Sequence, residues 1–459
     1  MKQLVPLCAL AALAVAACAL GVAAADGAAT GRATVFVDDD RAQCPNAGYT
    51  SIQAAVVAAR PGAMVRVCPG VYTETVVVNK PLRIHGEIGA VDEIDCFAPM
   101  LGTLSADEHA IVDPPGATAI GFVLNADDVR LTGFVVQGGS IGVTTSDEFS
   151  GYRVDHNLVR HQKQYQLTSG RLYGGYAVDF GTDGEVSSRV DHNCFRDNAA
   201  FDPRQQGNGW GLATEFGDVI NARIDHNKSY GLINAIELAR GRHRDVTIDH
   251  NESVRDLTGI GLWMSEGRSR IFANSSRLGR TRAIIVGGSN EDLEITHNVV
   301  ENGWRGIVFA SWVASAAPGP PVEGVVVRDN VIVGGGLDGI LADSSARLSD
   351  SVIANNTTSQ NAGNGIVLRP LTTGNTISGN VVLENGWNGI WAQAGTRNTL
   401  IENTMIGNGT GVPAAALNLT RPPVPWVDAR DDAWPANEWI ANSCGTDWPV
   451  DSVCLLKPA

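Results

Sequence analysis

Short strings of alternating polar and apolar residues recur along the chain, and each of them ends in asparagine. Examples are RVDHN, RIDHN, TIDHN, EITHN and TISGN. A β-branched residue or leucine lies three positions before each final Asn, and this alternation predicts a short β-strand. The aligned residues are Asn157, Asn193, Asn227, Asn251, Asn274, Asn298, Asn330, Asn356, Asn380 and Asn403.

The spacing of these asparagines reveals a repeat. Successive gaps are 36, 34, 24, 23, 24, 32, 26, 24 and 23 residues, so the base period is 23 to 24 residues and the longer gaps contain insertions. A period of this length is typical of a solenoid. The apolar residues three positions before each Asn form one inward column: Val154, Val190, Ile224, Ile248, Ile271, Ile295, Val327, Ile353, Ile377 and Leu400. Leu131, 23 residues before Val154, and Ile84, 47 residues before Leu131, extend this column upstream.

A second apolar column follows Gly or Ala in pairs such as Gly259-Ile260 and Gly389-Ile390. Each coil therefore contains at least two short strands. A leucine-rich repeat is the competing fold, but the return legs here contain Gly, Ser, Thr and Asn instead of regular leucines. We predict an all-β protein, a right-handed parallel β-helix of about 12 to 14 coils.

The pattern changes toward both ends of the chain. Residues 34–75 are expected to form an N-terminal strand and a capping helix within 50–60, which Pro61-Gly62 stops. Residues 76–412 contain the β-helix repeats, and residues 413–459, rich in Pro and Trp, are expected to form an irregular C-terminal cap.

Residues 1–25 have the composition of a secretory signal peptide: Lys2, an apolar stretch, and small residues ending at Ala25. The predicted location is therefore extracellular or in the cell envelope. Val15-Ala16-Ala17-Cys18 also resembles a lipoprotein processing box, which would leave a lipid anchor on Cys18. No second apolar segment is long enough to span a bilayer, and we expect a monomer.

The net charge indicates which partners to expect, and the cysteines indicate an oxidising compartment. Removing Lys2 with the signal leaves 34 − 1 = 33 basic and 49 acidic residues, a net charge of −16, which disfavours nucleic acid as a partner. Six cysteines follow the signal, and an exported protein can oxidise them. Cys444–Cys454 is the preferred pairing and Cys44–Cys68 the second, whereas Cys96 and Cys194 have no assigned partner.

The stretch SIQAAVVAARPGAMVRVCPGVYTETVVVNKPLRIHGE resembles the opening of pectinesterases and of bacterial right-handed β-helix repeat proteins of the pectin lyase-like superfamily. The Asn repeats resemble the same superfamily, including the NosD-like periplasmic proteins associated with copper. The two resemblances cover most of residues 34–412 and imply the fold. They transfer no catalytic residue, because Asp179-Phe180-Gly181 only faintly resembles a pectinesterase motif and Asp202-Pro203 lacks the residues of an epimerase motif.

Strand alternation directs the residues four and two positions before each Asn away from the core, as two surface columns. One interpretation is a surface lattice of salt bridges. The other is a groove for an acidic polysaccharide, in which the aspartates bind Ca²⁺ and arginines bind uronates or act as the base of a β-elimination. The columns are Arg83, Arg130, Arg153, Arg189, Arg223, Thr247 and Arg270, and His85, Thr132, Asp155, Asp191, Asp225, Asp249 and Phe272.

The second interpretation assigns a role to each candidate residue. Arg189 and Arg223 are the catalytic candidates, and Asp155, Asp191, Asp225 and Asp249 are the candidate metal ligands. The two longest gaps place insertions near 161–172 and 198–209 in the same turn, as a wall beside the two columns. With Arg153, the substrate-binding candidates in this wall are Lys163, Tyr165, Arg171, Tyr173, Arg204 and Trp210.

Histidines occupy the position just before the Asn in five repeats: His156, His192, His226, His250 and His297. Other repeats have Ala, Asp, Asn, Gly or Glu there, so the position favours residues that tolerate a left-handed backbone. The alternative is a ladder of transition-metal ligands.

These observations predict an exported β-helix that recognises a uronate-containing extracellular polysaccharide, with a Ca²⁺-dependent lyase as the enzymatic version. Two alternatives stay open: a non-enzymatic binding scaffold of the cell envelope, and a NosD-like periplasmic protein that handles copper. The sequence leaves open whether the protein is an enzyme.

Overall fold

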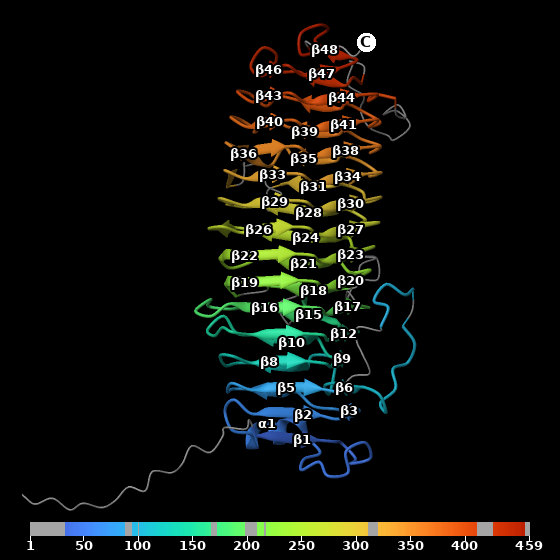
Figure 1. The fold of residues 1–459 in the computed structure, drawn as a ribbon, viewed down its shortest axis with the longest axis vertical. Helices are drawn as coiled ribbons and strands as arrows, with labels where there is room; N and C mark the ends of the chain where they lie inside the picture. The colour runs from blue at the N-terminus through green and yellow to red at the C-terminus, as the bar shows by residue number, and fades with distance from the viewer. Residues whose placement is uncertain are drawn as a thin grey trace, which may run out of the picture. The chain divides into compact units, whose positions relative to one another are not determined.

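The computed structural model describes residues 33–87, 94–99, 101–166, 172–197, 209–214, 217–310, 320–410 and 426–454. These residues belong to one compact unit that begins at Ala33. Three long parallel sheets run along this unit, here called sheets A, B and C (Figure 1). The prediction of a right-handed parallel β-helix is confirmed, whereas the predicted signal peptide and Cys18 lie outside the described residues.

Sheet A contains the strands that precede the corner asparagines. Its strands are β1 Thr34–Val37, β2 Met64–Val67, β5 Arg83–Gly86, β8 Arg130–Thr132, β11 Arg153–Asp155, β16 Ser188–Asp191, β19 Val219–Asp225, β22 His243–Asp249, β26 Arg270–Phe272, β29 Glu294–Thr296, β33 Val326–Arg328, β37 Val352–Ala354, β40 Thr376–Ser378, β43 Thr399–Ile401 and β46 Glu438–Ile440, with β25 Ser265–Glu266 paired to β22.

Sheet B follows sheet A in each coil, immediately after the corner. Its strands are β3 Gly70–Tyr72, β6 Ala110–Val112, β9 Val135–Gln137, β12 Leu158–Arg160, β17 Cys194–Arg196, β20 Lys228–Tyr230, β23 Glu252–Val254, β27 Ser275–Arg277, β30 Val299–Glu301, β34 Val331–Val333, β38 Thr357–Ser359, β41 Val381–Leu383, β44 Thr404–Ile406 and β47 Ser443–Cys444.

Sheet C completes the coil and contains the Gly-Ile pairs. Its strands are β4 Val76–Val78, β7 Ile120–Leu124, β10 Ile141–Thr145, β15 Tyr176–Asp179, β18 Trp210–Ala213, β21 Asn234–Leu238, β24 Thr258–Trp263, β28 Arg282–Gly287, β31 Ile307–Phe309, β35 Ile340–Ala342, β39 Ile366–Leu368, β42 Ile390–Ala392, β45 Ala429–Asp431 and β48 Asp447–Trp448. Two short pairs lie outside the three sheets: β13 Gln164–Gln166 with β14 Leu172–Gly174, and β32 Pro321–Glu323 with β36 Arg347–Ser349.

The corner between sheets A and B explains the repeated motif. The residue before each Asn has a left-handed backbone, with φ of 53° at His156 and 55° at His192, which confirms the structural interpretation of that position. Each Asn is buried and accepts a hydrogen bond from the backbone of the preceding corner, as when the Asn193 N–H donates to Asn227 Oδ1 at 3.1 Å. This ladder satisfies backbone groups that a bend would otherwise leave unpaired. The inward column of Ile, Val and Leu residues is fully buried, as predicted.

Each end of the described solenoid has features of its own. The predicted helix is α1, Ile52–Ala58, and Ser51 caps it by accepting a hydrogen bond from the Ala54 N–H. Residues 426–454 continue all three sheets through β45, β46, β47 and β48. The structure contains both predicted disulfides and also joins Cys96 to Cys194. No described helix combines the length and the apolar character that crossing a bilayer requires.

Candidate functional site

The predicted arginine and aspartate columns lie side by side on sheet A. Parallel register aligns Arg153 with Arg189, and Asp155 with Asp191. The next coils continue both columns through Arg223, Asp225 and then Asp249. The structure therefore brings the candidate catalytic and metal residues into one patch.

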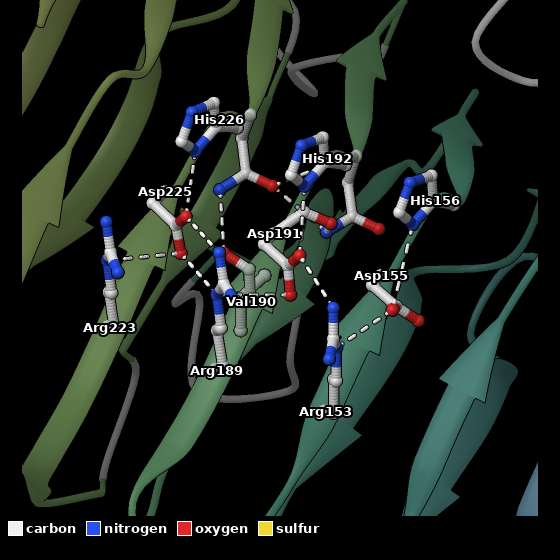
Figure 2. Close-up of polar contacts among 12 residues, drawn as sticks. Arg153, Asp155, His156, Arg189, Val190, Asp191, His192, Arg223, Asp225 and His226 are labelled. Carbon is white, nitrogen blue, oxygen red and sulfur yellow. Dashed lines mark hydrogen bonds and ion pairs between the residues drawn. The ribbon is translucent and has the colours of Figure 1, made fainter.

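The four aspartates of this patch point away from the apolar core, yet their side chains are 0% exposed. The expectation that they form a surface column is therefore wrong. The arginine side chains, 33–44% exposed, cover them from one side. The corner imidazoles, 35–46% exposed, cover them from the other side (Figure 2).

Each arginine links the carboxylate of its own coil to that of the next. Arg153 lies 2.9 Å from Asp155 and 3.3 Å from Asp191. Arg189 donates to Asp225 through Nε at 2.7 Å and Nη2 at 2.5 Å, and Arg223 bonds both oxygens of Asp249 at 2.9 and 2.7 Å. The patch is a continuous ion-pair lattice across consecutive coils.

The pKa values of these groups follow from the pairing. The hydrogen bond to Asp225 raises the pKa of Arg189, and the hydrogen bond to Asp249 raises that of Arg223. Burial opposes ionisation of Asp225, but hydrogen bonds from Arg189 and His226 still hold its pKa below the usual value. A guanidinium stabilised in this way retains its proton, so the geometry does not favour Arg189 or Arg223 as a base. Their catalytic role stays a prediction.

The metal role of the four aspartates also stays a prediction. Among the residues that the structure describes, none of the four belongs to a group of three ligand atoms within 4.8 Å of one another. Their oxygens already lie close to arginine and histidine nitrogens. The arginines neutralise the negative charge that Ca²⁺ would otherwise neutralise.

Four imidazoles form a stack beside the lattice. Ring centroids of His156, His192, His226 and His250 are 4.8, 4.8 and 5.0 Å apart, and the planes differ by only 1–3°. The Nδ1 atoms lie 3.6, 2.9, 2.8 and 2.7 Å from the aspartate of the same strand. A carboxylate on Nδ1 fixes the ring and leaves Nε2 facing outward. The edge of Phe272 ends the stack.

The two insertions fall in the same turn of consecutive coils, as predicted, but this turn does not border sheet A. The first separates β12 from β15 and the second separates β17 from β18, so both follow sheet B and lead into sheet C. Along the chain, a strand of sheet C follows each insertion before the next strand of sheet A, which carries the arginine column. In chain order both insertions come between sheets B and C, whereas the arginine and aspartate columns lie on sheet A, so the strand order does not support a wall beside these columns.

The substrate-binding candidates divide accordingly. Arg153 lies in the lattice on sheet A, whereas Trp210 begins a strand of sheet C. Lys163 is exposed just before the β13–β14 hairpin, in which Tyr165 and Tyr173 are directly paired. The candidates Arg171 and Arg204 lie outside the described residues.

Sheet C carries a carboxylate beside Trp210 that the sequence analysis did not identify. Trp210 Nε1 donates to Glu237 Oε2 at 2.9 Å, and Asn234 Nδ2 donates to the same oxygen at 2.5 Å. The Trp210 ring is 5.2 Å from that of Tyr176, tilted by 60°. Burial raises the pKa of Glu237 above its ordinary value.

A second carboxylate lies on the same outward column of sheet C. Asp179 aligns with Ala213, which aligns with Glu237, so the strands that carry the two carboxylates are two coils, about 9.6 Å, apart. Burial raises the pKa of Asp179 to about 7. Both side chains keep partial contact with solvent. Paired carboxyl groups with displaced pKa values are typical of acid–base sites.

A signal for Glu237 exists in the sequence. Every Ala-Ile or Gly-Ile pair of sheet C is followed by an outward residue, and this position holds Ile285, Val308 and Leu341 in later coils. Glu237 is acidic where the later coils from Gly261 to Trp391 have small or apolar residues. The asparagines mark the corner between sheets A and B and do not align the residues of sheet C. The repeat pattern therefore did not single out Glu237.

Comparison with known proteins supports the fold and leaves the activity open. Residues 244–418, less than half of the chain, match the family model of the periplasmic copper-binding protein NosD. This match and the fold confirm the predicted resemblance to NosD-like right-handed parallel β-helix repeat proteins. No protein with a curated function matches the chain significantly.

Several solved structures are similar at low identity. The Dettilon tailspike protein gp208 has 15% identity and a TM-score of 0.48, with coverage of 82% of this chain and 66% of the tailspike. DFA-IIIase from Arthrobacter chlorophenolicus A6 has 16% identity and a TM-score of 0.45, with coverage of 90% and 95%. The periplasmic alginate epimerase AlgG has 14% identity and a TM-score of 0.39, with coverage of 82% and 78%.

Proposed function

We propose that this protein binds an extracellular polysaccharide on the outer face of sheet C, and that Glu237 and Asp179 cleave a glycosidic bond there. The observation that carries the proposal is the Glu237 carboxylate, oriented by Trp210 and Asn234, two coils from a second carboxyl group. Insertions on one face of a solenoid often mark its binding side, and the β13–β14 hairpin of the first insertion leads directly into β15 of sheet C.

The two carboxyl groups suit different steps of hydrolysis. Asp179, with a pKa of about 7, is partly protonated near neutral pH and can protonate the leaving glycosidic oxygen. Burial raises the pKa of Glu237, and the hydrogen bonds that it accepts from Trp210 and Asn234 oppose that rise. In its ionised form it can take a proton from the attacking water. The strands that carry the two carboxyl groups are about 9.6 Å apart. In inverting glycosidases the two carboxyl groups are roughly 6.5–9.5 Å apart, which leaves room for that water, so the strand spacing is compatible with this mechanism.

The ligand we propose is a chain of sugars, with uronate-containing chains tested first. The partly exposed ring of Trp210, backed by the buried ring of Tyr176, supplies an aromatic surface on which a sugar ring can pack. Lys163 is an exposed cation near the same face, and the charge of Arg240 acts on Glu237. These cations fit carboxylates on the sugar.

The test is incubation of the mature protein with a panel of uronate and neutral polysaccharides. New reducing ends without ultraviolet absorbance indicate hydrolysis, whereas absorbance from unsaturated products indicates β-elimination. Glu237→Gln and Asp179→Asn should each lower turnover by about 10²–10⁴-fold, and the exposed control Glu185→Gln should not. Binding without bond cleavage on every chain would refute the catalytic part, and absence of binding would refute the whole proposal.

A second candidate function is transition-metal handling by the stacked imidazoles. The observation that favours it is the Asp–His pairing, because a carboxylate on Nδ1 raises the basicity of an outward Nε2 ligand. Parallel rings 4.8 Å apart cannot direct two Nε2 lone pairs at one ion, so ring rotation would have to accompany binding. Metal analysis of the purified protein separates the two candidates, since retained copper that His192→Gln and His226→Gln remove supports this function.

A further inference from the structure

Three consecutive aspartates follow the first strand of the solenoid. Asp38 is fully buried, Asp39 is half-buried and Asp40 is exposed. Each can offer one carboxylate oxygen, and the three oxygens lie within 4.8 Å of one another. Three negative charges at this spacing repel strongly unless a cation lies between them.

No positive side chain compensates these charges within the described part of the chain. The structure gives none of the three aspartates an ion pair there. The Cys44 N–H donates to Asp38 Oδ2, but the buried Asp38 Oδ1 has no hydrogen-bond partner. A buried carboxylate is normally paired or bound to a metal, because removing its charge from water is costly. Asp38 Oδ1 therefore points to a missing ligand.

The surrounding backbone holds the cluster in place. The Val71 N–H donates to Asp39 Oδ2 at 2.9 Å. A Cβ on Gly70 would lie 2.4 Å from Asp39 Oδ1, so only glycine allows the carboxylate to approach this strand. The disulfide Cys44–Cys68 joins the aspartate loop to the strand that precedes Gly70. Two covalently linked segments thus meet at the three carboxylates.

The chemistry of the oxygens selects the ion. Carboxylate oxygens with water and backbone carbonyls are the ligands of hard cations, and Ca²⁺ accepts the irregular geometry of a loop more readily than Mg²⁺ does. The nearby cysteines are in a disulfide and supply no thiolate. We propose that Asp38, Asp39 and Asp40 bind one Ca²⁺ ion, which fastens the loop after β1 to β3 and closes the N-terminal coil.

This site is separate from the aspartates of sheet A and from the carboxylates of sheet C, so its test needs no activity. Full-length mature protein is freed of metal with a chelator and titrated with CaCl₂, and with MgCl₂ for comparison, by calorimetry and thermal unfolding. We expect one Ca²⁺ per chain, weaker Mg²⁺ binding, and a melting temperature that rises with Ca²⁺ concentration. Hydrogen exchange should slow at residues 34–72 when Ca²⁺ is added.

Substitutions within the three aspartates test whether Ca²⁺ binds there. Asp40→Asn changes an exposed side chain, so it should fold and weaken Ca²⁺ binding at least 10-fold, and Asp39→Asn should act in the same direction. Glu185→Gln, an exposed carboxylate outside the cluster, is the control, and Ca²⁺ binding should survive it. The proposal is overturned if the wild-type protein binds no Ca²⁺, or if Asp40→Asn and Asp39→Asn bind it with unchanged affinity.

Discussion

His243, at the start of β22, should make the stability of the protein depend on pH. Its side chain is 0% exposed, and neither ring nitrogen has a hydrogen-bond partner among the described residues. Burial lowers its pKa from 6.5 to about 4, although the charge of Asp218 acts in the opposite direction. The folded protein therefore keeps the ring neutral at pH values where the unfolded chain binds a proton.

The sign and the size of the effect follow from these two pKa values. Because the folded-state pKa is the lower one, the stabilisation is complete above pH 6.5 and is lost as the pH falls through about 4. The difference of 6.5 − 4 = 2.5 corresponds to about 3 kcal/mol of unfolding free energy, at about 1.36 kcal/mol per pKa unit.

The assay compares the wild-type protein with His243→Phe, which retains an aromatic ring but has no proton to gain. Guanidinium unfolding followed by tryptophan fluorescence at several values between pH 4 and pH 8 gives the free energy of each protein. Between pH 7 and pH 4 the wild type should lose about 3 kcal/mol more than the variant. Parallel curves for the two proteins would refute the reasoning.

Three further substitutions test other parts of the solenoid. Asp256 is fully buried and its pKa is raised to about 6, so its contribution to the free energy of unfolding is lost as the pH rises. Asn361 occupies the same corner of a later coil. Asp256→Asn should therefore raise the free energy of unfolding at pH 8 by up to about 3 kcal/mol, measured by denaturant unfolding. Asp191→Ala should cost about 3–5 kcal/mol in the same assay, because Arg153, Arg189 and His192 lose a shared carboxylate; a loss below 1 kcal/mol would contradict the lattice. Replacing Cys96 and Cys194 by serine opens a link between residues 98 positions apart and should lower stability by about 4 kcal/mol, whereas an unchanged melting temperature would show that the link is not formed.

The sequence was sufficient to predict the coils because stacking imposes one environment on every equivalent position. Ile224 and Ile248 lie above each other in the core, and Asn227 and Asn251 share one hydrogen-bonded ladder. A residue that departs from such a column leaves a cavity or an unpaired backbone group, so the period is visible in the chain itself. The left-handed corner at His226 follows the same reasoning.

The burial of the aspartates could not be predicted in this way. Alternation gives the direction of Asp225 relative to the core but not what covers it. The cover comes from Arg189, which reaches across from the preceding coil, and from His226, whose ring the left-handed corner turns back over the carboxylate. The contacts of Arg189 and His226 with Asp225 depend on side-chain rotamers and on coil spacing. Neither can be derived from the spacing of residues in the sequence.

The sheets that flank the two insertions could not be predicted for a related reason. A gap of 36 or 34 residues between asparagines gives the length of a coil. It does not show which two of the three sheets the extra residues connect. Placing them between sheets B and C requires the strand order. That order moves Trp210 away from the arginine column and brings it to Glu237.

The lattice on sheet A and the carboxylates on sheet C belong to the same consecutive coils. Arg189 in β16 binds Asp225 in β19, while Trp210 in β18 binds Glu237 in β21, so both contacts join the same pair of coils. Arg153 joins the preceding coil, which carries Asp179, to Asp191. An acid–base pair two coils apart works only at a fixed coil spacing. Ion pairs between half-exposed arginines and buried aspartates on sheet A link the same coils, which gives the lattice a positioning role in the proposed site.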